Sequence, residues 1–520
     1  MGRGPQGFVS AAATEAAGFR HPGRVLLLIC AWLAAAAWLR PLMLPDEGRY
    51  AGVALEMLNS GDWLTPTFNG LPFFHKPPLF YWITAAGLSV LGVNEFAARS
   101  ASLLGGVAMA FSMALFARRW MSECSARTGL LVLLTQPLVF LASQFANLDM
   151  LVAGCIASTV FLLAHVLLCA DAGQPPGVAL PAAYVAAALG VLAKGLIGLV
   201  LPALVVGAWM LATRRWRRLP SLWSWTGALA FMAIALPWFV AAQLRHDGFA
   251  HYFFVVQHFQ RFTGTTFNNA QAWWFYPAVL VLLGLPWTPW LLRLWRPGRD
   301  AAGQDVRVLL WLWLALVVLF FSLPQSKLVG YVLPALPALS LLIAEVAPPP
   351  RSAGWWGSVV VAVVLCLGSV LYLSYYPPKT WRPLAQALHE QRAEGEPVLY
   401  AGDYFYDVAF YVRLRTPPVV VAAWDDPDIA QNDDWRKVLV DGAAFAPASA
   451  SALLLTPQQV LPLLCRHAVA WALVTDAAAP QQAWLANGRI VQRGRGAALW
   501  RIESTAATRG AACVGEAAHG

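Results

Sequence analysis

Pro45-Asp46-Glu47-Gly48-Arg49-Tyr50 directly follows the first long apolar run of the chain, and Phe74-His75-Lys76-Pro77-Pro78 precedes a second apolar segment. Charge this dense at the rim of a bilayer is costly and usually serves function rather than stability. Carboxylates can orient or deprotonate an acceptor, and Arg and Lys can bind a phosphate. The two segments therefore predict a membrane-embedded enzyme that acts on a phosphate-bearing lipid at the outer face of its membrane.

The composition agrees with a membrane protein. Of the 520 residues, 59% are hydrophobic and only 12% are charged, whereas soluble proteins carry roughly a quarter charged residues. The 25 Trp residues suit rings anchored at the water–lipid interface. The net charge of +9 comes from short clusters of cations between apolar runs, which fits membrane topology better than nucleic-acid binding. We therefore expect membrane lipids, and no nucleic acid, among the partners.

Eleven apolar runs approach the length of about 20 residues that a membrane-spanning helix needs. Some runs are short and some adjoin closely, so that neighbours can be split or merged, and the sequence predicts roughly 11–13 spans. The runs lie near residues 24–42, 98–117, 128–143, 150–170, 178–193, 196–212, 222–243, 273–294, 306–323, 328–346 and 355–375.

The arginines between these runs orient the chain. If eleven spans cross the membrane in alternating directions, all the arginine clusters fall on one side of it. The positive-inside rule assigns that side to the cytoplasm. The opposite side then holds the first loop (44–97), the loop at 244–272 and the tail from 376 onward. Residues 1–23 are rich in Gly, Ala and Arg and are expected to form a disordered cytoplasmic N-terminus. The clusters are Arg20 with Arg24; Arg118, Arg119 and Arg127; Arg214, Arg215, Arg217 and Arg218; and Arg293, Arg296 and Arg299.

The tail, residues 376–520, differs from the rest of the chain. Its alternating pattern and polar turns predict a small α/β domain, and it contains no nucleotide-binding or phosphate-loop motif. Its Cys465 and Cys513 would be able to form a disulfide in an oxidising compartment. The predicted helices cover residues 381–392, 406–412 and 457–467, and the predicted strands cover 397–401, 419–423, 471–474 and 489–501, the last interrupted by a turn or bulge at 493–496.

Three acids are the candidates for catalysis. Asp46 and Glu47 stand at the start of a predicted helix, and Asp149 follows Asn147 at the mouth of a span. A structural alternative for the first pair is capping of that helix, although a cap needs only one acid. Asp149 has no cation nearby in the sequence, and acids in such positions are usually functional. We therefore predict catalytic roles for Asp46, Asp149 and Glu47.

The candidates for binding a donor phosphate near these acids are Arg49, Tyr50 and Lys76, and His75, next to Lys76, is a candidate residue of the substrate cleft. The structural alternative for Lys76 is a side chain that merely extends along the bilayer interface. Lys194 lies at a break between two spans, where it is either a cleft residue or a structural ion-pair partner of Asp149.

Two later segments add polar candidates. His258 and Arg261 lie three residues apart on one face of a predicted helix, and Asn269 follows just before a pair of Trp residues. Lys327 and Tyr331 lie one helical turn apart at the end of another span. These residues are interpreted as walls of the substrate cleft or as phosphate ligands. The alternative for the first segment is an amphipathic helix at the membrane interface, and the alternative for Lys327 and Tyr331 is ordinary anchoring at that interface.

These elements together resemble the integral-membrane GT-C glycosyltransferases that use polyprenyl-phosphate sugars, in particular the family of lipid A aminoarabinose transferases, cousins of the protein O-mannosyltransferases. The resemblance extends over roughly residues 24–375. It implies a mainly α fold: a polytopic membrane helix bundle of GT-C type over 24–375, followed by a small C-terminal α/β domain outside the cytoplasm. It also implies a bacterial inner membrane, with the active site facing the periplasm. Four segments carry it: 45–51, 61–79, 147–149 and Ser326-Lys-Leu-x-x-Tyr-x-Leu-Pro334.

The resemblance also implies roles for single residues. Asp46 matches the essential acid of the first loop, and Asp149 matches the second acid. Lys76, Arg261 and Tyr331 match positions that hold the carrier phosphate.

One residue departs from the family pattern, because many relatives have Glu where this chain has His75. A metal-binding role carried by that Glu is therefore not expected here. A divalent metal remains possible, but no spacing of His, Cys, Asp or Glu in the sequence supports one.

The resemblance implies an enzyme that moves a sugar from undecaprenyl phosphate to lipid A, as aminoarabinose or a hexosamine on a phosphate. A protein or another envelope glycan is the alternative acceptor. A transporter of lipid-linked sugars would be expected to show internal repeats and charges within its spans, and neither is found. A non-catalytic scaffold would leave the concentrated charges unexplained.

Overall fold

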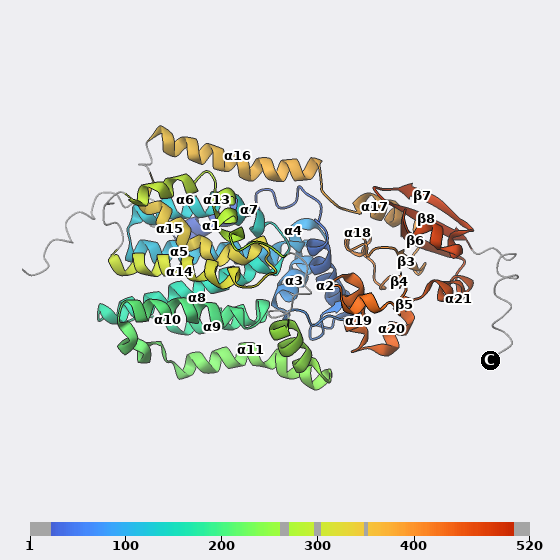
Figure 1. The fold of residues 1–520 in the computed structure, drawn as a ribbon, viewed down its shortest axis with the longest axis horizontal. Helices are drawn as coiled ribbons and strands as arrows, with labels where there is room; N and C mark the ends of the chain where they lie inside the picture. The colour runs from blue at the N-terminus through green and yellow to red at the C-terminus, as the bar shows by residue number, and fades with distance from the viewer. Residues whose placement is uncertain (1–21, 261–269, 296–302, 348–351, 504–520) are drawn as a thin grey trace, which may run out of the picture.

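The computed structural model describes residues 22–260, 270–295, 303–347 and 352–503. A long helical bundle occupies one end of the molecule and a mixed α/β region the other, with the first loop between them (Figure 1). The mainly α fold with a small C-terminal α/β region is therefore confirmed. Most of the N-terminal segment that is predicted to be disordered lies outside the described residues.

The bundle is built from apolar helices. Within the described residues, six helices are long and apolar enough to cross a membrane, or seven if the bent pair α6 and α7 forms one span. Four shorter apolar helices, α1, α3, α9 and α10, add to them, and the predicted run at 273–294 is divided into α13 and η3. The chain is thus a polytopic membrane protein, and the count of 11–13 spans stays a prediction.

The helical elements up to residue 375 are α1 (Pro22–Ala34), α2 (Asp46–Ser60), α3 (Leu79–Leu91), α4 (Glu95–Ala98), α5 (Ser100–Trp120), α6 (Glu123–Thr135), α7 (Pro137–Ser143), α8 (Leu148–Asp171), α9 (Ala179–Lys194), α10 (Ile197–Ala212), η1 (Arg215–Leu222), α11 (Trp225–Arg245), η2 (His251–Gln260), α13 (Phe275–Leu283), η3 (Thr288–Trp295), α14 (Gln304–Ser322), η4 (Val329–Ala335), α15 (Leu336–Val346) and α16 (Ala353–Tyr375). A short hairpin, β1 (Thr67–Phe68) and β2 (Leu71–Pro72), lies in the first loop.

Helices α5 and α8 form the centre of the bundle. A Cβ atom added at Gly105 would lie 2.5 Å from the Cα of Leu151, and one added at Gly154 would collide with the backbone of Gly105. The two backbones therefore approach more closely than any larger residue permits, as is common where membrane helices pack. This contact holds the N-terminal end of α8, and with it Asp149, against the rest of the bundle.

The C-terminal region is a six-stranded sheet with helices around it. Its strand order is β5-β4-β3-β6-β8-β7. Strands β5, β4, β3 and β6 run parallel to one another, β8 runs antiparallel to β6, and β7 runs antiparallel to β8. Its strands are β3 (Val398–Ala401), β4 (Val419–Val421), β5 (Leu454–Leu455), β6 (Val469–Thr475), β7 (Gly488–Arg493) and β8 (Ala497–Glu503). Its helices are α17 (Arg382–Gln391), α18 (Val408–Val412), η5 (Pro427–Ala430), α19 (Trp435–Ala443), α20 (Pro447–Leu453), η6 (Pro457–Gln459), α21 (Val460–Arg466), η7 (Ala479–Gln481) and η8 (Ala483–Leu485).

The predicted elements of the tail largely match this sheet. The predicted last strand is divided at Gly494–Gly496 into the hairpin strands β7 and β8, which agrees with the predicted turn. Helices α19 and α20 and strand β5 are additional elements that the sequence does not predict. Cys465 is disulfide-bonded, and its predicted partner Cys513 lies outside the described residues.

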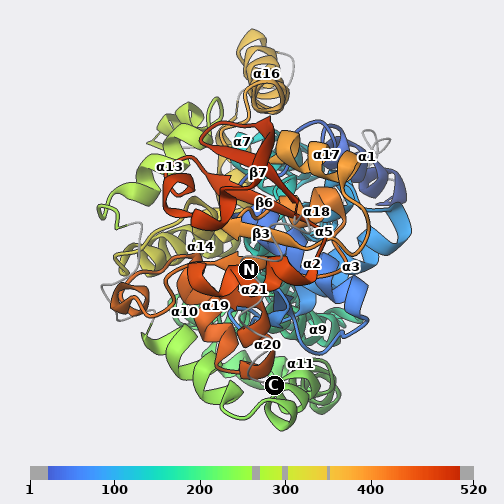
Figure 2. The ribbon, with the colours of Figure 1, turned by 90° about the vertical axis from the view of Figure 1, so that its right-hand side faces the viewer.

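The C-terminal region lies against the first loop (Figure 1), and in the end-on view it lies in front of α2 and α3 (Figure 2). Asn69, in the turn between β1 and β2, donates its side-chain N–H to the Pro418 carbonyl at 3.1 Å and accepts from the Tyr404 hydroxyl at 3.2 Å. Asn59 of α2 donates to the Leu414 carbonyl at 3.0 Å. The first loop therefore lies between the membrane helices and the sheet, and the candidate site residues at its start are covered by both.

Candidate functional site

The two acids Asp46 and Asp149 meet where the first turns of α2 and α8 come together. Asn147 caps α8: its side-chain oxygen accepts from the Asp149 N–H at 3.0 Å. The amide nitrogen of the same Asn147 donates to Asp46 Oδ2 at 3.2 Å. One capping residue thus links the two acids, although they are separated by about a hundred residues of sequence.

Lys194, at the last residue of α9, completes this cluster. Its ammonium donates to Asp149 Oδ1 and lies 4.3 Å from the centre of the Tyr331 ring. The sequence allows Lys194 to be either a cleft residue or a structural ion-pair partner of Asp149, and the structure contains this ion pair. The pairing also places Asp149, Lys194 and Tyr331, three predicted site residues on three different elements, in direct contact. We name Asp46, Asn147, Asp149, Lys194 and Tyr331 the acid–lysine cluster.

Gly330, next to Tyr331, is required for this contact. A Cβ atom added there would lie 2.9 Å from the carboxyl carbon of Asp149 and still closer to its Oδ2. We expect Gly330→Ala to displace the Asp149 carboxylate from Lys194 and to reduce turnover about 100-fold, the scale seen when a catalytic group shifts by about 1 Å. The measurement is the rate of the proposed transfer reaction with purified protein. Gly357→Ala on α16, where a Cβ meets nothing within 4 Å, is the matched control, and equal losses in both variants would contradict the expectation.

The environment of Asp46 raises the pKa of its carboxyl group above that of an exposed aspartate. Burial raises the pKa of its carboxyl group above the usual value. Arg49, one turn further along α2, lowers that pKa, and the neighbouring Asp149 raises it again. Perturbed acids of this kind, with a specific charge partner, are typical of catalytic groups.

Arg49 and Tyr50 point to different surroundings. The Arg49 guanidinium lies 5.2 Å from the Tyr406 ring centre and donates to the Tyr406 hydroxyl at 3.3 Å. Tyr50 is buried, with its ring 5.8 Å from that of Phe80 in α3. Arg49 therefore joins the acid–lysine cluster to the C-terminal region, whereas Tyr50 packs within the protein.

Glu47 has surroundings unlike those of Asp46. Its side chain is completely buried and pairs with Arg40 at 2.5 Å and Arg99 at 2.8 Å. It also accepts from the backbone N–H groups of Met43 and Ala146, both at 2.9 Å. Burial alone would raise the pKa of Glu47, but the two guanidinium groups overcome this effect and lower it to about 2.

The catalytic role of Glu47 stays a prediction, and this geometry argues against it. A carboxylate that accepts hydrogen bonds from four residues and has no exposed surface has neither a free lone pair nor access to a substrate. The Arg40–Glu47–Arg99 cluster instead ties the start of α2 to the segments before α5 and α8. We propose that Glu47 holds the position of Asp46 rather than reacting.

His75 and Lys76 lie at the turn before α3, next to the C-terminal region. The His75 ring stacks on Phe73 at 4.6 Å, and its Nε2 lies 3.9 Å from Oδ2 of Asp441 in α19. Tyr252 of η2 donates to the same Asp441 oxygen at 2.9 Å. Asp441, a residue of the tail, thus connects this turn with η2.

Lys327 is buried just before η4. Its ammonium donates to the carbonyl oxygen of Gln271 at 2.8 Å and lies 3.5 Å from that of Gln325. It therefore fastens the segment after residue 269 to the start of η4. Two of its three protons are engaged in this way, which leaves less capacity for the phosphate contact that the sequence predicts.

The segment around residues 251–269 is described only in part. Residues His251–Gln260 form a π-helix, so the predicted helix is present but is wound more loosely than an α-helix. Arg261 and Asn269 lie outside the described residues, as does the side chain of His258. In the parts of the chain that the structure describes, no group of three His, Cys, Asp or Glu residues is arranged to hold a metal ion.

Several residues of the site escape prediction because their partners are remote in sequence. The bond from Asn147 to Asp46 and the contacts of Asp441 with His75 and Tyr252 join separate segments. Local sequence offers one signal only, since Asn directly before a helix with Asp in its first turn is a common capping pattern.

Comparison with known proteins agrees with the resemblance seen in the sequence. The family model described as dolichyl-phosphate-mannose-protein mannosyltransferase matches residues 38–253. An undecaprenyl phosphate-alpha-4-amino-4-deoxy-L-arabinose arabinosyl transferase of Pseudomonas aeruginosa is 36% identical over 310 residues, covering 58% of this chain and 55% of the relative. Arabinosyl transferase 1 of Sodalis glossinidius, named in the same way, is 36% identical over 317 residues, covering 59% and 55%. The match thus spans a little over half the length of these relatives.

The fold has close counterparts among solved structures. The crystal structure of ArnT from Cupriavidus metallidurans bound to undecaprenyl phosphate has a TM-score of 0.77 at 24% identity and covers 92% of this chain and 97% of that one. The apo form of that protein gives a TM-score of 0.75 at 23% identity, with the same coverage. The GT-C fold and the resemblance to the lipid A aminoarabinose transferases are therefore confirmed.

Proposed function

We propose that this chain is a membrane glycosyltransferase that moves a sugar from a polyprenyl phosphate to an acceptor, and that the acceptor is lipid A. The names of the relatives and the shared fold support the reaction class and the undecaprenyl phosphate carrier. The observation that carries the proposal is the acid–lysine cluster, in which Asp46 and Asp149 meet at helix ends beside Arg49. The surrounding cations suit an anionic carrier, and the acids suit a sugar hydroxyl or an acceptor.

The proposed step exchanges one bond at the anomeric carbon of the sugar. An acceptor oxygen forms the new bond as the bond to the phosphate oxygen breaks, and polyprenyl phosphate leaves with the electron pair. If the acceptor is a hydroxyl group, its proton passes to Asp46. If it is a lipid A phosphate, the oxygen is already ionised, and Asp46 orients the sugar. The donor supplies the energy, so no nucleotide is required.

Lys76 is proposed to bind the phosphate of the donor, together with Arg49, Arg261 and Tyr331. Lys76→Ala would remove a charged hydrogen bond worth roughly 1.5–3 kcal/mol. We therefore expect kcat/KM for the donor to fall about 10- to 100-fold in an assay with purified protein. Lys379→Ala is the matched control, because that lysine is exposed and pairs with Asp403 in the tail. A Lys76 variant with unchanged donor kinetics would remove this residue from the phosphate site.

We further propose that the protein lies in the inner membrane of a bacterium, with the first loop and the tail in the periplasm. The distribution of arginines supports this orientation. The disulfide at Cys465 fits an oxidising compartment.

Mass spectrometry of lipid A tests the proposal. Cells lacking the gene would be complemented with wild-type protein, with Asp46→Asn, or with Asp247→Asn, which changes an exposed acid after α11. We expect a sugar-sized mass increment with wild type and with Asp247→Asn only, and the increment identifies the sugar class. Unchanged lipid A in all strains would reject this acceptor and favour a protein or another envelope glycan.

A further inference from the structure

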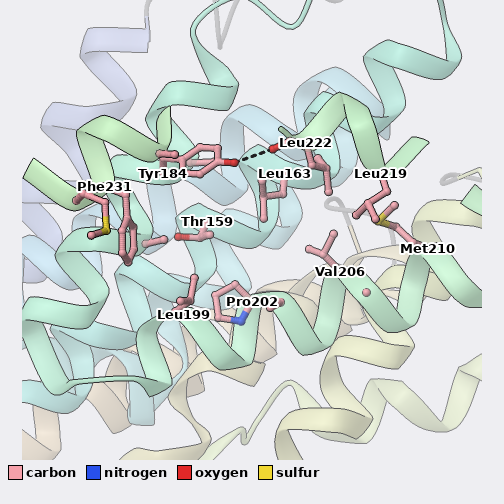
Figure 3. Close-up of a pocket in the computed structure, with 16 residues that line it drawn as sticks. Thr159, Leu163, Tyr184, Leu199, Pro202, Val206, Met210, Leu219, Leu222 and Phe231 are labelled. Atoms are coloured by element: carbon pink, nitrogen blue, oxygen red, sulfur yellow. Dashed lines mark hydrogen bonds between the residues drawn. The ribbon is translucent and has the colours of Figure 1, made fainter. Parts of the chain in front are cut away.

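A cavity of about 420 Å³ lies among α8, α9, α10, η1 and α11 (Figure 3). Its walls are almost entirely apolar. The two hydroxyl groups on the wall are engaged elsewhere: Thr159 donates to the Cys155 carbonyl at 2.8 Å, and Tyr184 donates to the Leu222 carbonyl at 2.9 Å. Neither hydroxyl has a free proton to donate, and the rest of the wall is apolar, so the cavity suits hydrocarbon.

The cavity continues along α11. A second apolar cavity of about 260 Å³ shares Leu199, Phe231 and Met232 with the first. Both open onto the surface of the bundle, which is expected to face lipid chains in a membrane. Together they offer an elongated apolar groove of the shape that an acyl chain needs.

The short helix η1 supplies both a wall and a charged rim. Leu219 and Leu222 line the cavity, and both are labelled in Figure 3. Arg214 and Arg217, close to them in sequence, are exposed. No residue of η1 is buried, so the helix lies on the surface of the bundle with apolar and cationic side chains side by side.

The rim carries an excess of positive charge. Arg215 pairs with Asp171 at 2.5 Å and Asp305 at 2.7 Å, and Arg218 pairs with the same Asp171 at 3.1 Å. Four arginines, at 214, 215, 217 and 218, therefore meet two carboxylates. The remaining charge favours an anion next to the apolar groove.

We propose that this groove and its rim bind an anionic diacyl phospholipid of the phosphatidylglycerol kind. Its acyl chains occupy the apolar groove, and its phosphate lies near Arg214 and Arg217. Basic pockets between membrane helices are known to recognise anionic head groups in this way. The connection between α10 and α11 lies at the end of the bundle remote from the C-terminal sheet, so the cationic rim is far from the acid–lysine cluster (Figure 1). The second cavity extends the groove to Gly195, the residue after Lys194 of that cluster. The arginine distribution predicts that this end is cytoplasmic.

Native mass spectrometry of the delipidated protein tests the proposal. The protein would be exposed to phosphatidylglycerol or to phosphatidylcholine with the same acyl chains, and bound lipid counted. We expect one phosphatidylglycerol to be retained at a concentration at least about tenfold below that needed for phosphatidylcholine. Inorganic phosphate is expected not to compete, because it cannot use the groove. Equal retention of the two lipids, or displacement of phosphatidylglycerol by an equal concentration of polyprenyl phosphate, would overturn the proposal.

Two variants separate the groove from the rim. Gly207 lines the cavity, and a Cβ added there meets nothing within 4 Å, so the backbone accepts a side chain there, and Gly207→Leu is expected to occupy the groove. We expect it to lose both lipids, whereas Gly357→Leu on α16, also in open space, retains them. The double variant Arg214→Gln/Arg217→Gln is expected to bind phosphatidylglycerol no better than phosphatidylcholine, and Arg293→Gln is its control. Wild-type lipid retention in both test variants would contradict the assignment.

Discussion

Asp46→Asn is expected to reduce sugar transfer by about 10²- to 10⁴-fold, the range that a positioned acid or base contributes. The substitution keeps the shape of the side chain and its contact with Asn147, but it removes the charge that faces Arg49 and the acceptor. The loss is expected mainly in kcat, because the proposed role of Asp46 lies in the reacting complex. The measurement is steady-state turnover of a polyprenyl-phosphate sugar by purified protein.

The pH dependence of wild-type turnover gives a second view of the same residue. Burial raises the pKa of Asp46, with a further contribution from Asp149 opposed by Arg49. If Asp46 must be ionised, activity falls on acidification at a higher pH than for an exposed aspartate. The residual activity of Asp46→Asn is expected not to show this fall in activity at acidic pH, which we call the acidic limb of the pH–rate profile. Asp247→Asn is expected to retain both the limb and the rate, and a comparable loss there would contradict a specific role for Asp46.

Glu47→Gln is expected to lower the free energy of unfolding by about 3–5 kcal/mol, the usual cost of removing one partner of a buried ion pair and leaving the other charge uncompensated. Arg40 and Arg99 are both buried and would lose the only carboxylate that the described structure places beside them. The measurement is thermal or denaturant unfolding in detergent. Glu123→Gln is the control, because its pair with Arg127 is largely exposed and is expected to contribute less than about 1 kcal/mol.

A combined variant distinguishes a structural Glu47 from a catalytic one. Replacing Arg40, Glu47 and Arg99 together by apolar residues of similar size removes the uncompensated charges, and we expect stability closer to wild type than in Glu47→Gln. A Glu47→Gln protein that unfolds like wild type but no longer transfers sugar would restore the catalytic role predicted from sequence.

The sequence predicts the helices, the tail and the identity of the acids more readily than their partners. Apolar runs and caps are local signals, and they correctly indicate α2, α8 and most elements of the tail. Helices α19 and α20 lack a long apolar face and escape prediction. Asp46 and Glu47 are neighbours in sequence, yet helical geometry turns one towards Asn147 and the other towards Arg40 and Arg99.

Long-range contacts decide which candidates come together. Lys194 reaches Asp149 because α8 and α9 pack side by side, and Gly330 permits η4 to approach the same carboxylate. Asp441 meets His75 only after the sheet has folded against the first loop. Pairings of this kind depend on the packing of whole elements, which no local pattern encodes.

Transfer of labelled sugar by the purified protein in lipid nanodiscs is the most direct measurement of the proposed function. The donor is a synthetic polyprenyl-phosphate sugar labelled in the sugar, and the acceptor is lipid A in the same membrane. Movement of label to lipid A with wild type and Asp247→Asn, but not with Asp46→Asn, is the predicted result. Transfer by Asp46→Asn at the wild-type rate would contradict the assignment of the acid–lysine cluster as the catalytic centre.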